Sequence, residues 1–160
     1  MSLYAIVRIR GTVDVPPKVE RTLELLRLRR RFTASLYHKN LPGLEDMLKA
    51  IESWATWGEI SKETLIDLLK RRGKIVGDKP LTDEFVKEVI KLQGGIEELA
   101  DKLLIGEIYY HKLEPLGVKP FFRLHPPKSG FDGSIKKAYR QGGELGYRGS
   151  AINELLKRMI

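Results

Sequence analysis

The sequence predicts an α+β fold in which a β-α-β-α-β core is followed by helices and then by an extended, basic C-terminal segment. Within residues 1–60, apolar residues alternate with a period of two in three short segments, and two segments with helical spacing lie between them. Helical spacing continues to residue 114, after which Gly and Pro become frequent. We therefore expect three units, which are residues 1–60, 61–114 and 115–160.

The first sixty residues are expected to form a small sheet with both helices on one face. Strands and helices alternate over residues 3–10, 17–28, 31–37, 42–53 and 55–60. Pro16 and Pro17 suit the start of the first helix, and Asn40 is a plausible cap for the second. The apolar positions predict one shared core that consists of Val7, Ile9, Leu23, Leu26, Leu36, Leu48 and Ile51.

Beyond residue 60 the pattern predicts helices and one long loop. Ser61 is expected to cap the first of these helices and Thr82 the second, because a hydroxyl at the first position accepts a hydrogen bond from a free backbone amide. Residues 105–111 fit a short strand. Residues 115–149 are expected to be an extended loop, after which Ser150 caps a last helix.

Composition excludes several classes of protein. The chain has 160 residues, and 42% of them are apolar, which is enough for one packed domain. Cys is absent, which excludes a disulfide scaffold, an iron–sulfur cluster, a Cys zinc site and a Cys nucleophile. No run approaches about 18 apolar residues, so we expect no membrane-spanning helix, and the first residues do not resemble a secretory signal.

The net charge of +8 indicates a polyanionic partner, and most of it falls in the C-terminal segment. Residues 115–160 hold nine Lys and Arg against three Asp and Glu, whereas residues 61–114 are close to neutral, with ten against eleven. Seven of the fifteen Gly and four of the eight Pro also lie after residue 114, so this segment cannot bury much apolar area by itself. We expect it to lie along a polyanion rather than to form a solvated tail.

The most concentrated basic cluster follows the first predicted helix and consists of Arg27, Arg29, Arg30 and Arg31. Two Arg would be enough to complement the dipole of a helix, whereas four repel one another unless an anion is near. Arg also suits bidentate contact with phosphate. The next residue, Phe32, is assigned to the core rather than to base stacking. We therefore interpret this cluster as a phosphate-binding site.

Two further clusters are weaker. Lys70, Arg71, Arg72 and Lys74 end a predicted helix, where dipole complementation is the simpler explanation. The other cluster is spread through the Gly-rich loop and has Phe131, Tyr139 and Tyr147 interleaved with its charges. Its members are Lys128, Lys136, Lys137, Arg140 and Arg148. Basic groups with spaced aromatic rings are typical of RNA binding, since unstacked bases offer faces and the backbone offers phosphates.

Other chemistry has little support in the sequence. His38, His111 and His125 have neither a close pair nor a neighbouring Cys, so we expect no metal site, and His125 fits a surface contact. The glycines around Gly142 match no phosphate-loop motif. They allow either close approach to a phosphate backbone or a flexible linker. We expect no catalytic residues, no cofactor and no small-molecule substrate.

Several segments resemble the archaeal and eukaryotic branch of the large-subunit ribosomal protein L-thirty family. In the first half these are residues 4–11, residues 21–30, Met47-Leu48 and residues 57–60. The C-terminal part resembles the family's basic loop and closing segment in His125-Pro126-Pro127, Gly130-Phe131, Gly142-Gly143, Gly146, Arg148, Ile152-Asn153, Leu155 and Arg158-Met159. One departure is Ser129, which stands where the family's loop has a glycine.

This resemblance implies a ferredoxin-like core over residues 1–60, followed by the extension of that branch. It also implies a structural constituent of the large ribosomal subunit, in the cytoplasm, whose partners are large-subunit ribosomal RNA and neighbouring ribosomal proteins. The candidate RNA-binding residues are Arg8, Arg10, Arg27, Arg29, Arg30, Arg31, Arg71, Arg72, Lys74, His125, Lys128, Phe131, Lys136, Lys137, Arg140 and Arg148.

Two alternative functions remain open at the level of sequence. One is a small acylphosphatase-like hydrolase on the same fold, with a phosphate held in the loop after the first strand by Arg21 and Asn40. Asp14 and the two prolines argue against it, because they add negative charge to that loop and remove amide donors. The other alternative is an RNA chaperone that acts outside the ribosome.

Overall fold

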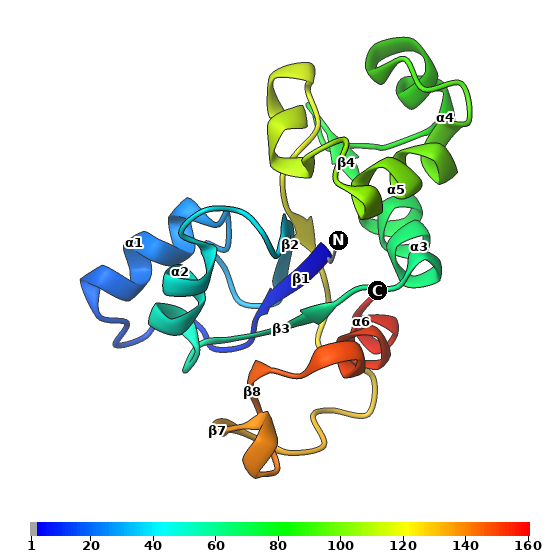
Figure 1. The fold of residues 1–160 in the computed structure, drawn as a ribbon. Coiled ribbons are helices and arrows are strands. Elements are labelled where there is room, and N and C mark those ends of the chain that lie inside the picture. Colours follow the sequence, from blue (N-terminus) through cyan, green and yellow to red (C-terminus); the bar gives the residue numbers. More distant parts are fainter. Residues whose placement is uncertain (1–2) are drawn as a thin grey trace.

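A computed structural model describes residues 3–160 and arranges them around one six-stranded sheet (Figure 1). The strand order is β6-β2-β1-β3-β8-β7, in which β1 is antiparallel to both β2 and β3 and β8 is parallel to β3. The sheet consists of β1 (Leu3–Arg8), β2 (Thr33–His38), β3 (Ala55–Glu59), β6 (Phe122–Arg123), β7 (Ser134–Ala138) and β8 (Gly143–Tyr147). A separate two-stranded hairpin consists of β4 (Lys74–Ile75) and β5 (Lys79–Pro80).

Helices cover both faces of the sheet (Figure 1). The first face is covered by α1 (Pro17–Leu25) and α2 (Leu44–Ile51), and the second by α3 (Lys62–Arg72), α5 (Gly95–Ile105) and α6 (Ile152–Met159). The short elements are α4 (Asp83–Phe85), the π-helical turn η1 (Val86–Ile90) and the 3-10 turns η2 (Tyr110–Leu116), η3 (Tyr139–Gln141) and η4 (Gly149–Ala151). The α+β fold with a ferredoxin-like β-α-β-α-β core is therefore confirmed.

The prediction of one shared core is wrong, because β1 is buried on both faces. Tyr4 and Ile6 pack beneath α1 and α2, whereas Leu3, Ala5 and Val7 belong to a second core under α3, α5 and α6. The residues expected to pack together are all buried, but they divide between these cores. Leu23, Leu26, Leu48 and Ile51 lie in the first, and Val7, Ile9 and Leu36 lie in the second. Alternation along a strand gives two faces, and both can be covered when helices come from elsewhere in the chain.

Two of the four predicted helix caps are confirmed. The Ser61 hydroxyl accepts a hydrogen bond from the Thr64 amide, and the Thr82 hydroxyl accepts one from the Phe85 amide. Asn40 and Ser150 do not act as caps. Gly43, in a left-handed conformation, precedes α2, and Ser150 lies inside the 3-10 turn η4 that leads into α6. A residue whose backbone is already helical cannot take the extended conformation that a capping side chain needs.

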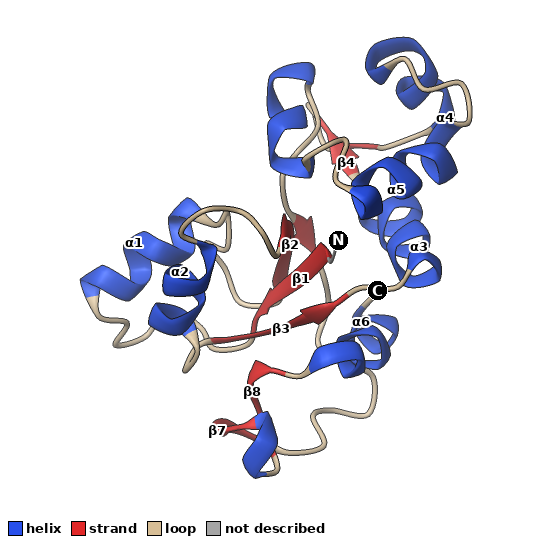
Figure 2. Cartoon of the chain, viewed as in Figure 1, coloured by secondary structure: helices blue, strands red, loops and turns tan. Residues whose placement is uncertain are grey.

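The C-terminal segment is more regular than an extended loop, and this corrects the prediction for residues 115–149. It contributes β6 to the edge of β2 and β8 to the edge of β3, with long loops between these short strands (Figure 2). Residues 105–111 are not a strand either, because α5 extends to Ile105 and η2 begins at Tyr110. Tyr110 and Leu113 are buried at a spacing of three, which fits a 3-10 turn. Residues 1–60 and 115–160 share the six-stranded sheet, and side chains of residues 61–114 pack with both of them in the second core.

Gly58 is the position in β3 where the C-terminal segment comes closest. A Cβ atom at Gly58 would lie 1.9 Å from the carbonyl oxygen of Gly149. In the same region, the Arg148 amide donates to the Trp57 carbonyl at 2.9 Å. Glycine at residue 58 therefore allows the backbone of η4 to cross directly over the sheet.

We expect Leu48→Ala to lower the free energy of unfolding by about 2–5 kcal/mol, because it leaves a cavity in the first core. Leu48 is 4% exposed, whereas Leu25, 60% exposed on α1, provides the control. Leu25→Ala should change the free energy of unfolding by less than about 0.5 kcal/mol. Equal effects of the two substitutions in denaturant melting would show that α2 does not pack on the sheet through Leu48.

We expect Gly58→Ala to destabilise the protein by roughly 1–3 kcal/mol, since η4 would have to move away from β3. Gly11→Ala is the matched control, because its added Cβ would meet only the Arg31 side chain, at 4.0 Å. Thermal and denaturant melting of both variants measure the difference. An unchanged Gly58→Ala variant would contradict the close crossing of η4 over β3.

Candidate nucleic-acid interface

Helix α1 ends in a Schellman motif, and the cluster of Arg27, Arg29, Arg30 and Arg31 lies at this end. The amide of Leu28 donates to the Leu23 carbonyl at 2.8 Å, and the amide of Arg27 donates to the Glu24 carbonyl at 3.0 Å. Arg27 has φ +65°, a left-handed conformation in which glycine is usual at this position. Leu28 is fully buried and anchors the chain, and Arg29 and Arg30 follow on the surface. The cluster therefore lies beyond the helix rather than within its last turn.

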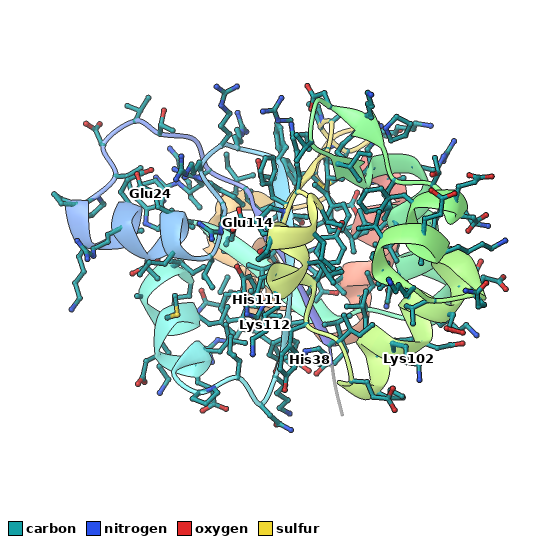
Figure 3. The ribbon with its side chains drawn as sticks, turned by 90° about the horizontal axis from the view of Figure 1, so that it is seen from above. Glu24, His38, Lys102, His111, Lys112 and Glu114 are labelled. Atoms are coloured by element: carbon teal, nitrogen blue, oxygen red, sulfur yellow. The ribbon has the colours of Figure 1, made fainter. Side chains whose placement is uncertain are left out.

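Arg27, Arg29 and Arg30 line a hollow that opens between α1, η2 and β6. Its other lining residues are Thr33, Glu114, Pro120, Phe121 and Arg123. Figure 3 shows Glu114 on η2, between the α1–α2 layer and the helices that cover the other face. Glu114 pairs with Arg27 at 2.9 Å. Among residues 3–160, no ion pair involves Arg29, Arg30 or Arg123, so three guanidinium groups there have no acidic partner.

Arg31 and Arg10 continue the positive surface from this hollow along the end of the sheet. The Arg31 Nε donates to the Ile9 carbonyl at 2.9 Å. Arg10 is the residue after Ile9, and its guanidinium lies 4.3 Å from the centre of the Trp54 ring. Arg10 also reaches the carbonyl oxygen of Ser53 at 3.3 Å. Arg31 is exposed and Arg10 is partly exposed, so both keep charge at the surface.

The basic cluster of the Gly-rich loop lies at the same end of the sheet as Arg10 and Arg31. Lys136 and Arg140 line a surface hollow together with Ser53, the residue that Arg10 contacts. Lys136, Lys137 and Arg140 are all exposed. The strand register explains this placement, because Arg8 of β1 pairs with Ala55 of β3, and β8 and β7 continue the sheet from β3. We call the group that gathers here the basic end of the sheet; it consists of Arg10, Arg29, Arg30, Arg31, Arg123, Lys136, Lys137 and Arg140.

Arg8 and Arg148 were also candidate RNA contacts, and the structure buries both. Arg8 is 0% exposed, and its guanidinium donates to the carbonyls of Leu28, Arg10 and Gly11 at 2.8–3.0 Å. Arg148 is 9% exposed; it donates to the Thr56 hydroxyl at 2.8 Å and pairs with Glu144 at 3.3 Å. Burial lowers the pKa of Arg148, and the Glu144 carboxylate opposes that shift. Both side chains satisfy buried polar groups of the fold.

The remaining candidates lie away from the basic end or support the chain locally. Arg72 donates to the Ile160 carbonyl at 3.0 Å, which fixes the C-terminal residue against α3. His125 lies 3.1 Å from the same oxygen, and Phe131 packs on Phe32 with ring centres 6.2 Å apart. The backbone carbonyl of Lys128 accepts from Arg158 at 2.9 Å. Arg71 lies on α3 and Lys74 on β4, and neither residue lines the two hollows described above.

Arg123 was missed by the sequence interpretation although it lies in the hollow with Arg29 and Arg30. It stands alone in the sequence, outside the basic clusters, in a segment expected to be a loop. Arg123 pairs with Thr33, so Arg123 lies beside the first residue of β2. The available signal was the alternation of Phe122, Arg123 and Leu124, which is a short strand pattern.

His38 and His111 do come together in the fold, although they are distant in the sequence (Figure 3). The His38 ring packs edge-on against the Tyr109 ring, with ring centres 4.7 Å apart. The His111 ring is stacked with the Tyr109 ring, with centres 6.0 Å apart. Burial lowers the pKa of His111, and its Nδ1 is buried without a hydrogen-bond partner. Among residues 3–160, no group of three or more His, Cys, Asp or Glu side chains is placed to hold a metal ion.

The hydrolase alternative places a phosphate in the loop after β1, and Asn40 lies far from that loop. Arg21 lies on α1, after the loop that leaves β1 at Arg8, whereas Asn40 follows β2 at His38. His38 pairs with Leu3 at the opposite end of β1, so the length of that strand separates the loop from Asn40.

Within the described part of the chain, no helix is both long and apolar enough to cross a bilayer.

Comparison with known proteins identifies relatives along the whole length of this chain. The family model described as ribosomal protein L30p/L7e matches residues 4–54. The large ribosomal subunit protein uL30 of Aeropyrum pernix is 64% identical over the full length of both chains. The proteins of the same name from Hyperthermus butylicus and Staphylothermus marinus are 61% and 55% identical, and the matches cover 100% and 99% of this chain and 91% and 98% of theirs. With relatives this similar from end to end, the chain belongs to the ribosomal protein L30p/L7e family.

Proposed function

We propose that this protein is a structural constituent of the large ribosomal subunit that binds ribosomal RNA through the basic end of its sheet. The observation that carries the proposal is the gathering of two basic clusters, more than one hundred residues apart in sequence, at one end of the sheet. The names of the relatives support the ribosomal assignment, since they are described as large ribosomal subunit proteins.

Electrostatics favours a nucleic acid as the partner. The basic end of the sheet contains eight Arg and Lys side chains, and among residues 3–160 no ion pair involves them. Nearby like charges repel one another and are stabilised when a polyanion approaches. Each phosphate that these groups neutralise releases counterions, so binding becomes tighter at low salt. Neighbouring ribosomal proteins would contact other surfaces of the chain.

The alternative functions fit the structure less well. The hydrolase needs Asn40 beside a phosphate in the loop after β1, but Asn40 follows β2 at the opposite end of β1 from that loop. A free RNA chaperone would use the same basic surface, so it differs from a ribosomal protein in location and not in geometry. Sedimentation separates these two functions.

We expect the protein in native cell extract to sediment with the large ribosomal subunit at low salt and to remain there at moderately raised salt, because it is an integral part of the particle. The measurement is a sucrose gradient followed by detection of this chain. A protein that stays at the top of the gradient at both salt concentrations would support the chaperone and contradict the ribosomal assignment.

Replacing Arg29 and Arg30 by Ala should weaken binding to a large-subunit RNA fragment and flatten the dependence of log affinity on log salt concentration. The Lys136→Ala, Lys137→Ala double variant should do the same by a similar or smaller amount. The two losses should add, since the clusters are separate. Fluorescence anisotropy at several salt concentrations measures both quantities.

The control is the Lys79→Ala, Lys87→Ala double variant, which removes the same charge from two exposed residues of the segment 61–114. It should leave the salt dependence nearly unchanged, and circular dichroism checks that every variant is folded. Folded variants of the basic end that bind RNA like the control would show that this surface is only solvated.

A further inference from the structure

The hollow beside the end of α1 has the form of a ligand site. Its volume is about 350 Å³, and it is lined by charged and aromatic side chains from three parts of the chain. A volume of a few hundred Å³ is typical of sites for small ligands or single groups of larger ones. We propose that it holds one unpaired nucleotide of an RNA strand, with a phosphate on Arg29 and Arg30 and the base against Phe121. This proposal rests on the proposed function and specifies how the RNA is held.

The edge of the sheet contributes to the hollow, because β6 is the edge strand beside β2 and residues of both strands line it. Phe122 is fully buried in the second core, under the opposite helices. Side chains alternate along a strand, so Phe121 and Arg123 point to the first face, where both line the hollow. Arg123 pairs in register with Thr33, which also lines the hollow. The floor is therefore strand surface, and the segment after α1 and the turn η2 form the walls.

Positive side chains outnumber acidic ones in the lining of this hollow. Four Arg side chains line it, together with one carboxylate, that of Glu114. Glu114 is engaged by Arg27 at 2.9 Å. Arg29, Arg30 and Arg123 then share one small space and, within residues 3–160, form no ion pair. Such an arrangement is favourable when an anion enters, and the planar guanidinium group matches phosphate oxygens in pairs.

The backbone of Arg27 is also unusual for its position. Its φ of +65° places an Arg in the left-handed conformation that ends α1, a conformation that glycine adopts at the lowest conformational energy. This conformation turns the chain so that Arg29 and Arg30 follow at the rim of the hollow. Non-glycine residues in this region of φ are enriched at ligand-binding sites.

The aromatic floor distinguishes a nucleotide from other anions. Phe121 is partly exposed in the hollow, and the Arg123 guanidinium lies 5.8 Å from the centre of its ring. A base can stack on a phenyl ring and on a guanidinium plane, whereas an acidic peptide segment offers carboxylates but no flat group. A paired base is stacked within its own duplex, so only an unpaired nucleotide presents both its phosphate and its base face.

Titration of the full-length protein followed by NMR tests this site. The probes are adenosine 5′-monophosphate, uridine 5′-monophosphate, inorganic phosphate, a uridine trinucleotide and a hexaglutamate peptide. We expect both mononucleotides to shift the signals of Arg29, Arg30 and Arg123 and to bind at least about five-fold more tightly than phosphate, because of base stacking. The trinucleotide should bind more tightly again. Tighter binding of hexaglutamate than of the mononucleotides would assign the hollow to an acidic protein segment and overturn the proposal.

A free mononucleotide and a nucleotide within RNA share the same chemistry, and the trinucleotide separates them. If the trinucleotide binds more weakly than the mononucleotides, the site belongs to a free nucleotide and the proposal is wrong. Phe121→Leu should reduce mononucleotide affinity to that of phosphate and leave phosphate affinity unchanged, whereas Phe121→Tyr should retain stacking. Arg21→Gln, on the exposed surface of α1 outside the hollow, is the charge-matched control for Arg30→Gln, which should weaken all anionic probes.

Failure of this proposal can be distinguished from failure of the proposed function. If Phe121→Leu binds a large-subunit RNA fragment as tightly as the wild type, and mononucleotides shift no signal of the hollow, the nucleotide site is wrong and the ribosomal assignment stands. Conversely, mononucleotide binding in the hollow by a chain that does not sediment with the large subunit would support the site and overturn the ribosomal assignment.

Discussion

The burial of β1 on both faces is the constraint on which the rest of the structure depends. Tyr4 and Ile6 contribute to one core, while Leu3, Ala5 and Val7 contribute to the other. Because successive side chains point to opposite faces, a register shift of one residue would exchange the two sets. The same shift would carry the Arg8 side chain away from its carbonyl partners and toward the second core. The pairing of β1 with β2 and β3 is therefore strongly specified, and every other element is placed relative to it.

Arg8 connects this central strand to the surface that we propose binds RNA. Its guanidinium is fully buried and donates to carbonyl oxygens of Arg10, Gly11 and Leu28. These acceptors lie in the loop that leaves β1 and in the segment that follows α1, so one buried cation holds both segments beside each other. Buried charge is costly unless it is paired or hydrogen-bonded, and here three carbonyls and Glu20, at 3.5 Å, supply that compensation. The buried Arg8 side chain thus orders the segments that carry the Arg residues proposed to bind RNA.

The C-terminal segment is ordered by packing as well as by any partner. Leu155, Leu156 and Met159 of α6 fill the second core, and the Arg72 side chain bonds the carbonyl of Ile160. Before these anchors in the chain, Arg148 pairs with Glu144 and donates to the Thr56 hydroxyl of β3. Lys136 and Lys137 are thereby held near the surface that the first Arg cluster occupies. A basic segment rich in Gly gains order from a few buried contacts, although its own composition supplies little apolar area.

The sequence by itself determined the order of strands and helices in the first sixty residues, the caps at Ser61 and Thr82, and the basic character of the chain, because these depend on local periodicity and on composition. The resemblance of its motifs was also enough to identify the family. Only the tertiary structure decided that β1 divides two cores, that Arg8 and Arg148 are buried, and that Arg123 joins Arg29 and Arg30. Each of these results depends on pairing between segments tens of residues apart, such as Thr33 with Arg123 and Thr56 with Gly146. Local patterns fix which face a side chain takes along its own strand, but they carry no information about which distant segment covers that face.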